Sequence, residues 1–383
     1  MRPIYFDYAA TTPVDPRVAQ AMSECLTFEG NFANPASRSH ALGWLAEEAV
    51  EDARNEVADL LGADSREIIW TSGATESNNL AVKGVAENYA PDECHIVTTT
   101  IEHKAILDPV KHLQEKGYGA TFVSPNAQGL VTVESIAAAI TDKTRLVSVM
   151  AVNNETGVIN PVAEIGELCN QKNIYFHVDA AQAIGKIPVN IDDWQVTLLS
   201  ISAHKFYGPK GVGALYVRRR SSLDLVAQIH GGGHERGMRS GTLATHQLVG
   251  IGTAAAVLNE GFSDESKRIA KLKERLWLGL KELGDVSVNG KGAPITAGHL
   301  NVCFKGLDGE SLMMGVRNLA ISSGSACTSA TVEPSFVLKA MGCSDEDAHS
   351  SLRISLGRYT TKGDVDMAIE SFTQAVTGLR TAK

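Results

Sequence analysis

Short apolar runs alternate with amphipathic patterns over the first two-thirds of the chain. The runs are rich in Val, Ile and Thr and mostly lack strict polar alternation, which is typical of strands buried on both faces of a largely parallel sheet. We expect strands at Glu67–Trp70, His95–Thr99, Ala120–Val123, Leu146–Met150, Ile174–Val178, Leu198–Ser202 and Val212–Val217.

Helical patterns lie between these runs. Apolar residues recur at three- and four-residue spacing over residues 41–62, which predicts an amphipathic helix there. Asn160 and Pro161 predict the start of another helix, with Asn160 as the cap and Pro161 at the first position. A strand–helix alternation of this length predicts an α/β domain with crossover helices.

The pattern changes after about residue 260. Residues 263–284 predict a long charged helix, and short strands and a last helix follow at His299–Phe304, Leu319–Ser322, Leu352–Ser355 and Asp364–Leu379. We therefore predict a large domain over residues 15–260. Residues 1–14 and 261–383 would form a smaller α+β domain.

Composition narrows the functional class. The 383 residues include 35 basic and 44 acidic side chains, and this net charge of −9 argues against a general nucleic-acid binder. No apolar run approaches the roughly 18 residues that would span a bilayer. The start of the chain lacks a secretory pattern, so we expect a cytoplasmic protein. Six cysteines without a CxxC pair argue against a disulfide scaffold and against a zinc site.

Three segments carry candidate cofactor chemistry. Small residues over 71–77 follow a strand and open a helix, where free amides favour a phosphate, although a turn capped by Ser or Thr also fits. Asp179 ends a strand, where it could hold a cationic ring nitrogen, cap a helix or join an ion pair. Lys205 precedes a glycine-rich turn, where it could act as an amine nucleophile or be an ordinary solvated lysine. Together these are the parts needed to bind pyridoxal phosphate.

Three further residues could act on a substrate. Cys327 lies among small polar residues, which predicts an exposed, reactive thiol, although free cysteines are more often buried. His103 follows a strand and could face a cofactor ring or simply cap a helix. Arg353 could pair with an amino-acid carboxylate or with a structural acid.

At these residues the sequence resembles the cysteine desulfurases of the NifS/IscS type, in the class V aminotransferase superfamily. The matching motifs are DYAATTPVDPRV (7–18), TSGATESNN (71–79), EHK (102–104), VNNETG (152–157), HVDAAQ (177–182), SAHKFYGPKGVGALYVRR (202–219), GGGHERGMRSGT (231–242), SSGSACTSA (322–330) and SLRISLGRYTT (351–361). The resemblance implies an α/β fold type I transferase dependent on pyridoxal 5'-phosphate. Its large domain would hold a mainly parallel seven-stranded sheet, and its small domain would carry the catalytic cysteine segment at about 322–335.

The resemblance also implies cofactor contacts. Lys205 would hold the cofactor as a Schiff base, Asp179 would pair with the pyridine nitrogen, and Gln182 would pair with the ring hydroxyl. His103 would stack on the ring and carry a proton. The remaining implied cofactor positions are Ala74, Thr75, Asn154, Ser202, Ala203, His204 and, from the other subunit of a homodimer, Thr242.

The implied substrate is L-cysteine, with Asn154 and Arg353 as its contacts. Cys327 would take the sulfur as a persulfide and release L-alanine, supplying an iron–sulfur scaffold protein and, as a further acceptor, tRNA thiolation. No resident metal is implied, although Cys327 could transiently ligate a 2Fe–2S cluster. Family members that feed the scaffold typically continue beyond the point where this chain ends. A selenocysteine lyase or another class V aminotransferase is the alternative.

Overall fold

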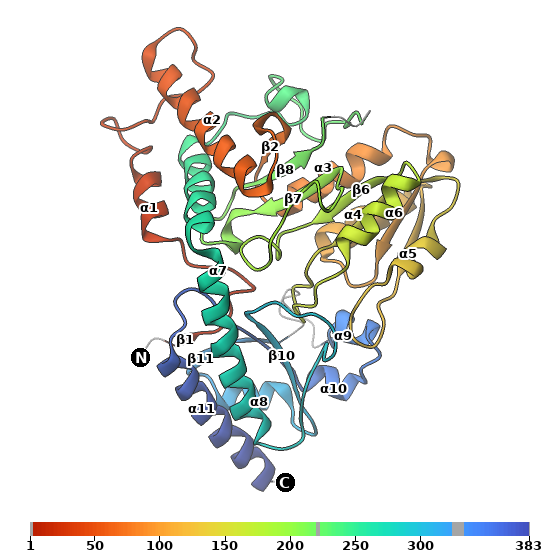
Figure 1. The fold of residues 1–383 in the computed structure, drawn as a ribbon, viewed down its shortest axis with the longest axis vertical. Coiled ribbons are helices and arrows are strands. Elements are labelled where there is room, and N and C mark those ends of the chain that lie inside the picture. Colours follow the sequence, from red (N-terminus) through yellow and green to blue (C-terminus); the bar gives the residue numbers. More distant parts are fainter. Residues whose placement is uncertain (1–2, 220–222, 324–332, 383) are drawn as a thin grey trace.

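The structure, a computed structural model, describes residues 3–219, 223–323 and 333–382 (Figure 1). Its largest element is a seven-stranded sheet with the order β2-β8-β7-β6-β5-β3-β4. Only β8 runs antiparallel to its neighbours in this sheet, so the predicted mainly parallel seven-stranded sheet is confirmed. The strands are β2 (Ile68–Thr71), β3 (His95–Thr99), β4 (Gly119–Val123), β5 (Thr144–Met150), β6 (Tyr175–Asp179), β7 (Leu198–Ser202) and β8 (Gly213–Val217).

Helices cover both faces of this sheet. Because successive side chains of a strand point to opposite faces, both sets of side chains are buried. On one face, α3 (Ala74–Ala86) and α4 (Lys104–Glu115) pack on residues such as Ile69 and Leu146. On the other face, α2 (Ala41–Leu61) and α6 (Val162–Gln171) pack on residues such as Trp70 and Val147, and the first half of α7 (Thr245–Lys281) packs on α2. This two-sided burial explains why the strands read as continuous apolar runs.

The C-terminal part contains an antiparallel sheet with the order β12-β13-β10-β9 and a parallel pair, β1-β11. The helix α7 passes from the large sheet to this part, where it lies beside α11 (Figure 1). The remaining elements are β1 (Ile4–Tyr5), α1 (Pro16–Ser23), α5 (Val133–Ala139), β9 (Val286–Val288), β10 (His299–Phe304), α8 (Gly309–Gly315), β11 (Leu319–Ala320), β12 (Ser322–Ser323), α9 (Phe336–Ala340), α10 (Asp345–His349), β13 (Ser351–Ser355) and α11 (Lys362–Thr381).

The predicted strands of the large sheet all occur, within two residues at each end. The helix α7 begins at Thr245 rather than at residue 263, and it is continuous through the domain boundary that we predict at residue 260. Its first half packs closely on α2, because a Cβ at Gly252 would lie only 2.6 Å from the Cα of Ala53. The small residues that allow this contact lack the spacing of large apolar side chains by which we recognise a helix in the sequence, so the sequence pattern does not predict the first half of α7. The division into domains stays a prediction.

Two other local predictions were wrong. Asn160 does not cap α6, whose N-cap is Pro161. The Asn160 side chain is buried instead, accepting from the Val131 amide at 3.1 Å and donating to the Met150 carbonyl at 2.9 Å. The single strand expected over Leu319–Ser322 is two short strands, β11 and β12, in different sheets. Among the described residues, no helix is both long and apolar enough to cross a membrane.

A buried ion pair connects three elements at the β2 edge of the large sheet. Arg54 of α2 donates to both carboxylate oxygens of Glu235, at 2.7 and 3.0 Å. Glu235 also accepts from the backbone amide of Trp70 at 2.8 Å. The pair therefore holds the segment 231–242 against α2 and β2.

We predict that Arg54→Met destabilises the protein by about 3–5 kcal/mol, because it leaves a buried carboxylate without its cation. The measurement is urea unfolding followed by circular dichroism. The matched control is Arg38→Met, since Arg38 pairs with Glu47 at the surface and should contribute little. Equal losses in the two variants would contradict the role given to the buried pair.

Candidate active site

A cavity of ≈420 Å³ opens at the carboxyl ends of the parallel strands, where ligands bind in open α/β sheets. Most residues singled out in the sequence line it: Ala74, Thr75, His103, Asn154, Asp179, Gln182, Ser202, His204, Lys205 and Arg353. Ala203 is fully buried and Thr242 is exposed, and neither lines this cavity. Cys327 lies outside the described residues.

The start of α3 provides backbone donors at one end of the cavity. Gly73 is its N-cap, with φ 145° and ψ 179°, a conformation that favours glycine. No side chain caps this helix, so the alternative of a turn capped by Ser or Thr is not what the structure has. The first-turn amides of Ala74 and Thr75 have no partner within a helix and can donate to an anion such as a phosphate.

Asp179 lies buried at the end of β6. Its Oδ2 accepts from Asn78 Nδ2 at 2.7 Å, and its Oδ1 accepts from the Ala181 amide at 2.9 Å. Both of these donors are uncharged amide groups. The carboxylate is therefore held in place by neutral donors and can pair with a cationic group of a ligand.

Lys205 follows β7 and lies against the N-terminal segment. Its Nζ donates to the carbonyl oxygens of Ala9 at 2.8 Å and Ala10 at 2.7 Å. The neighbouring His204 contacts Thr11 Oγ1 through Nδ1 at 3.1 Å. Burial, followed by the charge of Lys205, lowers the pKa of His204 to about 4, so its imidazole is neutral at neutral pH.

His103 is the N-cap of α4, and its Nδ1 accepts from the Ala105 amide at 3.1 Å. In the neutral ring this bond assigns the proton to Nε2. Burial is the largest cause that lowers the pKa of His103, and the positive charge of Lys205 acts in the same direction. A neutral imidazole in this position can take up a proton and return it.

Arg353 of β13 reaches the cavity from the small antiparallel sheet. Its Nη1 donates to the Asn154 carbonyl at 3.0 Å, and its Nη2 donates to Asp7 Oδ1 at 2.8 Å. Its Nε is buried without an acceptor among the described residues. The structural ion pair thus exists, and the guanidinium keeps a donor that a substrate carboxylate can use.

Two buried acids beside the site were not identified from the sequence. Glu102 accepts from Thr99 Oγ1 at 2.8 Å and from the Met150 amide at 2.9 Å, and burial raises its pKa to about 8. Glu155 accepts from Ser335 Oγ at 2.5 Å, and burial raises its pKa to about 7. Both lie in motifs quoted above, but local polarity does not reveal that their carboxyl groups are buried.

The described residues on either side of the Cys327 segment meet the substrate end of the cavity. Ser322 of β12 pairs with Arg353 in the sheet. On the other side, Ser335 contacts Glu155, which directly follows Asn154. Arg353 and Asn154 both line the cavity. Ser322 and Ser335, which lie on either side of the Cys327 segment in the sequence, are therefore next to the expected substrate contacts.

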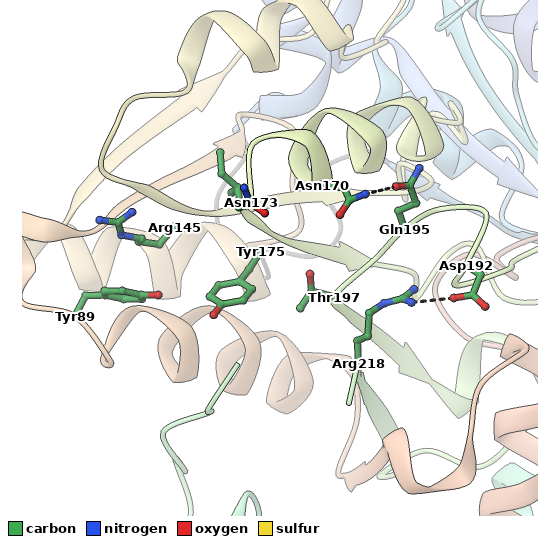
Figure 2. Close-up of a pocket in the computed structure, with 10 residues that line it drawn as sticks. Tyr89, Arg145, Asn170, Asn173, Tyr175, Asp192, Gln195, Thr197 and Arg218 are labelled. Carbon is green, nitrogen blue, oxygen red and sulfur yellow. Dashed lines mark hydrogen bonds and ion pairs between the residues drawn. The ribbon is translucent and has the colours of Figure 1, made fainter. Parts of the chain in front are cut away.

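A second hollow lies at the opposite, amino ends of β5 and β6 (Figure 2). Its volume is ≈490 Å³, and two pairs of its polar side chains are bonded to each other. Arg218 donates to Asp192 at 2.9 Å, and Asn170 donates to Gln195 at 2.9 Å. The described residues that line it include neither a lysine nor a cysteine, so we assign the inferred chemistry to the first cavity.

The raised pKa of Glu102 generates a prediction about stability. Between about pH 4.5 and pH 8 the folded protein holds a proton that the unfolded chain releases. The free energy of unfolding therefore falls as the pH rises through this range. Glu102→Gln removes this effect, and its thermal midpoint should increase relative to that of the original protein from pH 5 to pH 9.

The matched control is Glu48→Gln on the exposed side of α2, whose effect on the midpoint should not depend on pH. A pH-independent difference between Glu102→Gln and the original protein would contradict the assignment of the buried proton.

Comparisons with known proteins agree with this geometry. The aminotransferase class-V family matches residues 4–367. The cysteine desulfurase IscS of Shewanella sp. (strain MR-4) is 57% identical over 378 residues, covering 99% of this chain and 94% of that protein. IscS of Proteus mirabilis (strain HI4320) is 56% identical over the same shares.

Solved structures give the same relationship. A NifS-like protein superposes with a TM-score of 0.91 at 37% identity, covering 98% of this chain and 100% of that one. A structure described as SspA in complex with cysteine has a TM-score of 0.84 at 39% identity, covering 94% and 100%. The fold, the cavity and these similarities together place the chain in the class V aminotransferase family, among the cysteine desulfurases of the IscS type.

Proposed function

We propose that this protein is a cysteine desulfurase that uses pyridoxal 5'-phosphate to convert L-cysteine to L-alanine and retains the sulfur as a persulfide on Cys327. The observation that carries the proposal is the convergence of Lys205, Asp179 and the uncapped start of α3 in one cavity, with Arg353 at its edge. The IscS relatives are the enzymes most similar in sequence among those compared above.

The residues present fit this cofactor. The amides of Ala74 and Thr75, together with Ser202 and His204, would hold its phosphate. Asp179 would pair with the ring nitrogen, since its carboxylate is held in place by the neutral amides of Asn78 and Ala181. When bound, the cofactor supplies an electron sink that stabilises negative charge at the α-carbon of an amino acid.

The chain's own residues then bind the substrate and move its protons. Arg353 would bind the substrate carboxylate through the donors that Asp7 and Asn154 leave unused. The Lys205 amine lies in the cavity and would take the α-proton. The Cys327 thiolate would attack the substrate sulfur, and the bond between that sulfur and the β-carbon breaks. The electron pair of that bond would stay with the β-carbon, and protons delivered to the β-carbon and returned to the α-carbon would complete L-alanine.

The other cysteines do not compete for this role. Cys25, Cys94, Cys169 and Cys303 are buried, and Cys343 is half-buried. Burial raises the pKa of Cys94 to about 11, of Cys169 to about 12 and of Cys303 to about 11. Because the thiolate is the attacking form, the raised pKa disfavours attack by these three thiols at neutral pH. This elimination supports Cys327.

We propose that the enzyme is a homodimer in which Thr242 contacts the cofactor phosphate of the other subunit. Thr242 is exposed and lies outside the cavity of its own chain. The segment that carries it is fixed by Glu235 and by Arg239, which pairs with Glu76 at 2.7 Å. A fixed and exposed segment of this kind suits a contact across an interface.

The sulfur acceptors that we propose are an iron–sulfur scaffold protein and, as a second route, tRNA thiolation enzymes, in the cytoplasm. Cys327 would in addition be a transient ligand of the 2Fe–2S cluster during transfer. A selenocysteine lyase or another class V aminotransferase is the rival function.

The decisive experiment incubates the purified protein with L-cysteine and a reductant and measures alanine and sulfide together. We expect equal amounts of both, and loss of both in Cys327→Ala. Cys343→Ala is the matched control and should retain activity, because its thiol is half-buried outside the cavity. A keto acid as the product, with Cys327→Ala still active, would favour the aminotransferase alternative.

A second prediction concerns substrate binding. Asp7→Asn removes the carboxylate that holds Arg353 Nη2 and should raise the KM for L-cysteine about five- to tenfold, with a smaller change in kcat. Steady-state kinetics measure this split. Asp64→Asn, which removes the partner of the exposed Arg66, should leave both constants unchanged. A fall in kcat alone would show that Arg353 does not depend on Asp7 for binding.

A further inference from the structure

A second lysine lies close to the Schiff-base position. The Nζ of Lys186 donates to Oε1 of Gln182 at 2.7 Å. The residue is half-buried as a whole, but its amine lies in the interior. Burial, with the positive charges of Lys205 and Arg353, lowers the pKa of Lys186 well below its ordinary range. Within the described ranges, Gln182 is the only hydrogen-bond acceptor of this amine, and no carboxylate pairs with it.

The contacts of Gln182 fix the orientation of its carboxamide. Its Nε2 donates to the Ala9 carbonyl at 2.7 Å, while its Oε1 accepts from Lys186. A carboxamide has one acceptor oxygen and one nitrogen with two N–H donors. Rotating it by half a turn would place its nitrogen against the Lys186 amine and its oxygen against the Ala9 carbonyl. Both contacts therefore select one orientation.

This orientation leaves one N–H of Nε2 without an assigned acceptor. Gln182 is buried and lines the cavity together with Asp179 and Lys205. A neutral N–H donor in this place suits an oxygen substituent of the cofactor ring, and a carboxamide in the opposite orientation could not donate to it.

Lys186 and Lys205 both line a small hollow of ≈30 Å³, and Lys205 lines the main cavity as well. A buried amine without a counter-charge is unfavourable for stability. An apolar side chain of similar length would avoid this cost, so packing alone gives no reason for a lysine here.

We propose that Lys186 is a positioning residue for cofactor binding. By donating to Oε1 of Gln182, it holds the carboxamide so that Nε2 presents its second N–H to an oxygen of the cofactor ring. The inference rests on the proposed function, because it concerns the same cofactor. It assigns Lys186 no contact with the substrate.

The test measures the dissociation constant of pyridoxal 5'-phosphate by titrating the cofactor into cofactor-free protein and following its absorbance. Lys186→Met should raise the dissociation constant about fivefold, and Gln182→Leu should raise it about tenfold. Because Lys186 acts through Gln182, adding Lys186→Met to Gln182→Leu should change the constant less than twofold. Fully additive effects would overturn the proposal.

Lys273→Met is the matched control. Its amine is also buried and donates to one acceptor, the Thr296 carbonyl, at 2.6 Å, but it does not line the cavity. We expect no change in the dissociation constant. A loss equal to that of Lys186→Met would show a general effect of removing a buried amine and would also overturn the proposal.

Gln182→Glu separates the two contacts and keeps the inference testable if Lys186→Met does not fold. The glutamate still accepts from Lys186 but, as a carboxylate, has no N–H to donate to the cofactor or to the Ala9 carbonyl, so we expect weaker cofactor binding although the contact with Lys186 is kept. Cofactor affinity equal to that of the original protein would overturn the donor role. Failure of the original protein to bind the cofactor would instead refute the proposed function.

Discussion

The active site depends on hydrogen bonds between the N-terminal segment and two sheets that are distant from it in sequence. The carbonyl of Ala9 accepts from both Lys205 and Gln182, and the Asp7 carboxylate holds Arg353. The same segment is bonded to the small sheet, since the Ser355 amide donates to the Phe6 carbonyl at 2.7 Å. A short stretch of chain thus sets the position of the lysine relative to the arginine.

This arrangement separates the tasks of the two sheets. The carboxyl ends of the large sheet supply Asp179 and Lys205, and the start of α3 supplies the backbone donors for an anion. The small sheet supplies Arg353 and the strand that leads into the Cys327 segment. In the function proposed above, Lys205 and Arg353 would come from different sheets, so the geometry of the site would require the two sheets to keep a fixed position relative to each other.

Much of this could be predicted from the sequence, for physical reasons that differ between the parts. Strands buried on both faces leave apolar runs that are visible without any alignment, and motifs such as TSGATES and HVDAAQ identify the candidate site residues. The contacts that hold those residues could not be predicted in this way. The bond between Asp7 and Arg353 joins residues 346 positions apart, and Asn160 resembles a helix cap although its side chain is buried. Lys186 and Glu102 read as ordinary charged positions because burial is a property of the fold.

The continuous helix α7 has a consequence for how proteins of this shape can vary. It packs on α2 beside the large sheet and contacts β9 and β10 of the small sheet, and an α-helix turns by about 100° per residue. Inserting one residue near its middle would rotate its second half, with the small sheet packed on it, by about that angle relative to the cofactor side. Changes in length within α7 are therefore tolerable only in steps near whole turns, whereas the surface loops can lengthen freely. The number of residues in α7 therefore sets the orientation of Arg353 relative to Lys205.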